Sequence, residues 1–113
     1  MLKRDNRIGR NKEFDRAFKI GQSFYGKILG LKVVDNDLEI SRLGVLISTK
    51  VSKKAVIRNK FKRQIKQIIR TELPELKKGK DLVIIVFPQI LDKNFQEISL
   101  FLKNSLRQLK LYK

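Results

Sequence analysis

Residues 55–70 of the 113-residue chain read AVIRNKFKRQIKQIIR, and this stretch decides the fold. On a helical wheel drawn at about 100° per residue, one side is apolar. It holds Ile57, Phe61, Ile65 and Ile68, with Ile69 at its margin. The opposite side holds Asn59, Lys62, Arg63, Lys66 and Arg70, and Arg58 and Lys60 lie at the two flanks. We therefore predict an amphipathic helix from about Ala55 to Glu72, with its apolar face on a sheet and its basic face outward.

The charge on the outer face of this helix has a single sign. An ordinary solvated face mixes acids and bases so that residues four apart attract each other. Here no acid occurs between Ala55 and Thr71, so that cations such as Lys62 and Lys66 repel each other. Such a face is expected to meet phosphates, which release counterions when they are neutralised. Arginine can bind a phosphate in bidentate fashion, and Asn59 is suited to a directional hydrogen bond to a phosphate, a sugar hydroxyl or a base edge.

The composition of the whole chain supports a polyanionic partner. Lys and Arg number 27 against 11 Asp and Glu, which gives a formal net charge of +16. Nucleic acid, an anionic membrane surface and an acidic protein all fit this excess, and we favour nucleic acid. Cysteine and histidine are absent, which excludes disulfides, Ser-His-Asp and Cys-His catalysis and the usual zinc sites. The chain begins with the polar MLKRDNRIGR, and its longest apolar run, Leu82 to Phe87, is far too short for a membrane span. We expect a soluble, cytoplasmic protein.

The remaining pattern predicts one α+β domain over residues 1–113, an α-β sandwich. A short helix is capped by Asn11 and ends at Gly21. Extended structure follows from Phe24 to Val34, where Gly26 and Gly30 mark bends or bulges. This run forms either one strand or two. A turn at 35–37 leads to a second extended run, Ile40 to Ser48, which we expect to pair with the first. After the basic helix, Lys77 to Lys80 form a turn, DLVIIVF at 81–87 forms a covered strand, and Asp92 caps a last helix. The predicted order is α-β-β-(β)-α-β-α with a mixed sheet.

Several segments, taken in order, resemble one known family. The run Arg58-Asn59-Lys60-Phe61-Lys62-Arg63, preceded by Ala55-Val56 and followed by Lys66 and Arg70, is similar to the signature helix of the bacterial ribonuclease P protein subunit. The segments EFDRAF at 13–18, RLGVLIS at 42–48 and KDLVII at 80–85 resemble its first helix, the strand before its basic loop and its last strand. The resemblance covers nearly the whole chain. Lys60 stands where that family usually has an arginine.

The resemblance implies a protein subunit that assists removal of the 5′ leader from precursor tRNA. Its partners would be the catalytic RNA and the leader, with no membrane and no dedicated protein partner. The implied contacts with the catalytic RNA are Lys53, Lys54, Arg58, Asn59, Lys60, Lys62, Arg63, Lys66 and Arg70. The family fold carries a left-handed β-α-β crossover, against the usual right-handed rule. Mg²⁺ would be bound mainly by the RNA subunit.

The first helix and the sheet are also implied to form a cleft for the single-stranded leader. Phe14 and Phe18 are four residues apart and lie among Lys12, Arg16 and Lys19. Aromatic rings interleaved with cations suit a single strand, whose bases stack and whose phosphates need neutralising. By spacing alone both rings would more simply fill the core. The resemblance favours a leader cleft of Phe14, Phe18, Arg16 and Tyr25.

The sequence holds no evident catalytic or metal site of its own. The one tight acidic group, Asp35, Asp37 and Glu39, falls in a predicted turn, where such residues are ordinary. The chemistry should therefore come from the partner RNA and its Mg²⁺ ions. The alternatives are a non-catalytic ribosomal or RNA-assembly protein and, least favoured, a self-sufficient metal nuclease.

Overall fold

A computed structural model describes residues 22–36 and 38–113. The predicted first helix, including Phe14, Arg16 and Phe18, lies outside the described residues, as does Asp37. Within them the order is β1 (Gln22–Tyr25), β2 (Leu29–Asp35), β3 (Arg42–Leu46), α2 (Ala55–Glu72), the short 3-10 turn η2 (Leu73–Glu75), β4 (Lys80–Val86), a second 3-10 turn η3 (Pro88–Asp92) and α3 (Phe95–Gln108). None of these helices is both long and apolar enough to cross a bilayer.

The sheet is mixed and four-stranded, in the order β1-β2-β4-β3. β1 and β2 are antiparallel, β2 and β4 are antiparallel, and β3 and β4 are parallel. The first extended run is thus divided into two strands, with Gly26 in the turn between them, while Gly30 lies inside a regular β2. Our prediction that the run at 40–48 pairs with the first run is wrong, because β4 lies between β2 and β3. At this central position β4 is hydrogen-bonded along both of its edges, and most of its side chains are buried.

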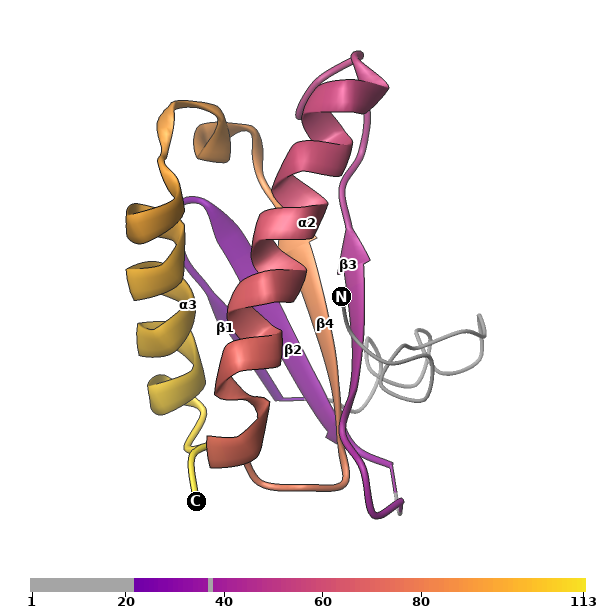
Figure 1. The fold of residues 1–113 in the computed structure, drawn as a ribbon, viewed down its shortest axis with the longest axis vertical. Coiled ribbons are helices and arrows are strands. Elements are labelled where there is room, and N and C mark those ends of the chain that lie inside the picture. The colour runs from indigo at the N-terminus through magenta and orange to yellow at the C-terminus, as the bar shows by residue number, and fades with distance from the viewer. Residues whose placement is uncertain (1–21, 37) are drawn as a thin grey trace.

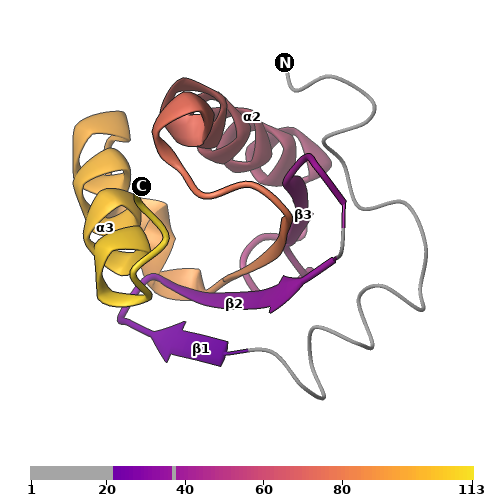
Figure 2. The same cartoon turned by 90° about the horizontal axis from the view of Figure 1, so that it is seen from below.

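Both helices cover the same face of this sheet (Figures 1 and 2). Residues alternating along β2 and β4, among them Leu31, Val33 and Ile84, point into the main core with Ile65 of α2 and Leu102 of α3. The intervening residues face the other side, where Val34 and Val83 form a smaller buried cluster. The core therefore lies between the sheet and the two helices, and the apolar stripes of α2 and α3 hold both helices in place.

The connection from β3 through α2 to β4 is left-handed. β3 and β4 point the same way, α2 passes in front of them, and β4 lies to the left of β3 in Figure 1. A right-handed crossover would place β4 on the other side. The crossover that the resemblance implied is therefore present.

The last helix begins two residues later than predicted. Asp92 belongs to η3, and Asn94 caps α3 by accepting a hydrogen bond from the Glu97 N–H at 2.8 Å. The Glu97 side chain in turn accepts from the Asn94 N–H at 3.2 Å, which completes a capping box. Asp92 lacks this partner at its third following position, so the reciprocal pair selects Asn94 over Asp92.

Candidate nucleic-acid interface

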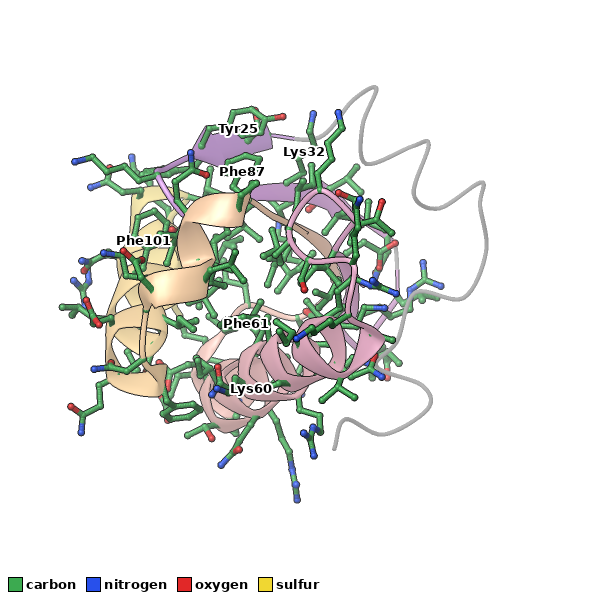
Figure 3. All side chains as sticks on the ribbon, turned by 90° about the horizontal axis from the view of Figure 1, so that it is seen from above. Tyr25, Lys32, Lys60, Phe61, Phe87 and Phe101 are labelled. Carbon is green, nitrogen blue, oxygen red and sulfur yellow. The ribbon has the colours of Figure 1, made fainter. Side chains whose placement is uncertain are left out.

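The basic helix spans Ala55–Glu72, as predicted, and Pro74 follows it in η2. Phe61, Ile65, Ile68 and Ile69 are buried, and Ile57 is half-buried. Ile69, which the wheel placed at the margin, is fully covered. The apolar side of α2 therefore packs against the core, and this packing fixes the rotation of the helix about its own axis. In Figure 3, Phe61 points inward and its neighbour Lys60 points out.

The outward side of α2 carries the predicted polar residues together. A hollow of about 730 Å³ runs along this side of α2. Its described lining comes from α2 alone: Val56, Asn59, Lys62, Arg63, Lys66, Gln67 and Arg70. We call these residues the α2 basic face. Lys62 and Lys66 are half-buried, whereas Asn59, Arg63 and Arg70 are exposed.

The start of α2 has the electrostatics of an anion site. Lys54 is the N-cap residue and makes no side-chain capping bond, and the first turn holds no acid. The N–H groups at the start of the helix carry the positive end of the helix dipole. Exposed Lys53 and Lys54 lie beside it, so that phosphate is favoured there.

The loop before α2 is held in place by its own contacts. Val51 is buried in the core, and its N–H donates to the Ser48 carbonyl at 3.1 Å. The Arg58 guanidinium donates to the Ser52 carbonyl at 2.8 Å. Arg58 therefore ties the loop to the helix, a structural role that adds to its predicted contact with RNA.

A second group of side chains gathers on the face of the sheet opposite α2 and α3. Tyr25 pairs with Gly30 across the β1–β2 hairpin, and its ring lies over that glycine. Lys32 follows on the same face of β2, with its Nζ 5.6 Å from the centre of the Tyr25 ring. Phe87, just after β4, reaches the same place, as Figure 3 shows. We call Tyr25, Lys32 and Phe87 the Tyr25 platform.

The platform has the composition of a surface for single-stranded nucleic acid. Tyr25 is 55% exposed, so that a base can stack on its ring. A cation beside exposed rings can neutralise the phosphates of a strand whose bases stack. The sequence predicted Tyr25 but not Lys32 or Phe87. Only the strand register places Lys32 two residues beyond the partner of Tyr25.

Two acidic side chains near the ends of the strands form ion pairs within the fold. Asp81 is 2% exposed; it accepts from Arg42 Nε at 2.8 Å and from the Arg42 terminal nitrogen at 2.6 Å, and from Asn36 Nδ2 at 2.7 Å. Asp35 ends β2 and forms an ion pair with Lys80. No group of three or more potential metal-binding side chains occurs in residues 22–36 and 38–113.

Comparison with known proteins gives one consistent result. The sequence matches the ribonuclease P family over residues 2–110. It is 39% identical over 111 residues to the ribonuclease P protein component of Pseudanabaena sp. (strain PCC 6903), covering 97% of this chain and 96% of the relative. It is 41% identical over 110 residues to that of Clostridium botulinum (strain 657 / Type Ba4), covering 96% and 98%.

Solved structures agree with the sequence relatives. The RNase P protein of Staphylococcus aureus superposes with a TM-score of 0.88 at 28% identity, over 96% of this chain and 98% of that one. The RNase P protein of Thermotoga maritima gives 0.82 at 28% identity, over 90% and 96%. The family, the relatives and the fold coincide, and the chain belongs to the ribonuclease P protein family.

Proposed function

We propose that this chain binds the catalytic RNA of ribonuclease P through the α2 basic face and the loop at 48–54, and holds the 5′ leader of precursor tRNA on the face of the sheet opposite α2 and α3. The observation that carries the first part is the single sign of charge on the α2 basic face, which the buried side of the helix turns outward. The Tyr25 platform supports the second part. As a family member the chain is the protein component of an endoribonuclease and works with an RNA.

The bond cleavage itself is assigned to the RNA and its Mg²⁺ ions. Asp81 and Asp35 are each paired with a cation, Arg42 and Lys80, which is a poor arrangement for binding a divalent metal. The role left to the protein is electrostatic: it reduces repulsion between two polyanions and positions the substrate strand. The work would take place in the cytoplasm, where precursor tRNA is made.

The test replaces three cations of the α2 basic face in one variant, Lys62→Ala/Arg63→Ala/Lys66→Ala. Affinity for the catalytic RNA is measured over a range of salt concentrations. We expect weaker binding and a salt slope smaller by roughly one unit for each lost phosphate contact. Alanine is a strong helix former and the three side chains lie off the buried stripe, so the fold should be retained.

A control variant removes the same charge elsewhere. Lys93, Lys103 and Arg107 all belong to the α3 side of the molecule and can be replaced together by alanine. If this control weakens binding as much as the α2 variant does, net charge rather than the α2 basic face is responsible. A ribosomal or assembly protein would bind RNA through a similar helix, but would not lower the Mg²⁺ requirement for cleavage of precursor tRNA.

A further inference from the structure

A second cationic hollow is lined by residues of β1, β2 and the segments 77–80 and 109–111. The end of β2 and the start of β4 lie at the bottom of the sheet in Figure 1. Neither the α2 basic face nor the Tyr25 platform contributes to this hollow. It measures about 490 Å³. Its described lining consists of Gln22, Val33, Val34, Asp35, Lys77, Lys80, Leu109, Lys110 and Leu111. We call it the basal notch.

The notch is separate from the two surfaces already described. None of its lining residues belongs to α2. Gln22 and Tyr25 stand at the two ends of β1, which puts the notch about 10 Å along the strand from the platform, at about 3.3 Å per residue. An RNA group bound in the notch would therefore make a contact of its own.

The backbone that carries Lys77 and Lys110 is held in place by hydrogen bonds. The Lys77 N–H donates to the Leu111 carbonyl at 2.7 Å, and the Lys113 N–H donates to the Glu75 carbonyl at 2.9 Å. Leu76 and Tyr112 form a bridge between the same two segments. Leu111 is buried in the core. Lys77 and Lys110 therefore lie on two segments that are hydrogen-bonded to each other. Because the backbone of both segments is already ordered, little backbone entropy is lost when the two lysines bind one ligand.

The charge balance of the notch favours an anion. Three lysines face one carboxylate, Asp35, which is already paired with Lys80. Lys77 and Lys110 are exposed. The Gln22 amide adds a neutral hydrogen-bond donor, and the buried Val33 and Leu111 exclude water from the floor, which strengthens attraction to a charge above it.

We propose that the basal notch binds a phosphodiester group of RNA, as a contact independent of α2 and without base recognition. The lining offers ammonium and amide donors but no exposed aromatic ring on which a base could stack, so backbone phosphate is the matching chemistry. The proposal rests on the RNA-binding function proposed above. The phosphate can belong to the catalytic RNA or to the precursor leader, and the two are separated by experiment.

The test uses the double variant Lys77→Gln/Lys110→Asn. Lys110 has a φ of 56°, a conformation that asparagine tolerates, and the Lys77 N–H is kept by glutamine. Salt-dependent affinity is measured for the catalytic RNA alone, and for precursor and mature tRNA with the reconstituted complex. We expect the log-log slope to fall by about one to two units in one of these measurements. A fall with the catalytic RNA assigns the phosphate to that RNA, and a fall with precursor only assigns it to the leader. The charge-retaining Lys77→Arg should keep the parent slope.

Two results would overturn the proposal. One is an unchanged slope with every RNA in a double variant that melts like the parent. The other is an equal fall in Lys93→Ala/Lys103→Ala, which removes as much charge from the α3 side of the molecule. The α2 triple variant is measured in parallel. If it reduces the slope and the notch variant does not, only the notch proposal fails, whereas failure of the α2 variant would reject the proposed function itself.

Discussion

The ring of Tyr25 lies so close over Gly30 that a β-carbon at residue 30 would come within 2.5 Å of Tyr25 Cδ1 and 3.5 Å of Phe87 Cζ. Glycine at this position lets an aromatic side chain lie flat on the neighbouring strand, still exposed to solvent. The close approach therefore sets the position of the platform, because any larger residue must push the ring away.

Gly30→Ala should disturb leader binding without removing any group that could contact RNA. The added methyl displaces the Tyr25 ring, and loss of one stacking ring costs about 1–3 kcal/mol of binding. We expect weaker binding of precursor tRNA by the reconstituted complex and little change for mature tRNA. The two affinities and the melting temperature are measured together.

A double-mutant cycle gives the control. Once Tyr25→Ala has removed the ring, adding Gly30→Ala should have little further effect on precursor binding. Additive losses would mean that residue 30 acts through something other than Tyr25.

Phe14→Ala and Phe18→Ala carry the same test to the first helix, which lies outside the described residues. If the leader is held there, each folded variant should lose about 1–3 kcal/mol of affinity for precursor tRNA and almost none for mature tRNA. A core role would instead lower the melting temperature and reduce both affinities alike.

The protein freed of RNA should not cleave precursor tRNA with any divalent metal. Added to the catalytic RNA, it should allow cleavage at a lower Mg²⁺ concentration than the RNA needs alone, since its cations take over part of the charge neutralisation. Cleavage is followed over a Mg²⁺ titration with and without protein. Robust cleavage by RNA-free protein would contradict the assignment of the chemistry to RNA.

Asp81→Ala should be strongly destabilising. It leaves Arg42 and Asn36 without the carboxylate that both contact, and breaking a buried ion pair in this way costs about 3–5 kcal/mol, with the lower end expected because Arg42 is partly exposed. Urea unfolding measures the change. Asp35→Ala is the matched control, because its carboxylate is 70% exposed and a surface pair contributes about 0–1 kcal/mol.

Stability at high pH should depend on Tyr112. Burial, and then the hydrogen bond that its hydroxyl donates to Glu72 at 2.7 Å, raise the pKa of Tyr112 above its ordinary value of about 10. The folded protein thus keeps this proton at a pH where the unfolded chain releases it, so this contribution is complete below pH 10 and declines as the pH rises further. Tyr112→Phe should lose less stability than the parent between neutral pH and about pH 11. Parallel decline of the two proteins would show that Tyr112 does not contribute.

The sequence predicted α2 well because the wheel and Pro74 act locally. It did not predict the sheet order, because periodicity shows which face of a strand is buried but not which strand lies beside it. The unbroken LVIIV of β4 did indicate a covered strand, which agrees with its place between β2 and β3. Asn94 could have been preferred to Asp92 as the cap of α3, because Glu97 stands three residues after it and completes a capping box. Lys32 and Phe87 join Tyr25 only through strand register, which no short-range pattern contains.

The order of the strands has a consequence for a chain emerging from the ribosome. β4 is the last strand to be made, yet among the described residues it is the sole strand neighbour of β3 and the partner of β2 as well. Until residues 80–86 have appeared, β3 lacks the strand with which it pairs in the finished sheet. The native arrangement is therefore closed by contacts made late and across long stretches of sequence, such as Leu31 with Ile84, which predicts slower folding than for a helical domain of this size.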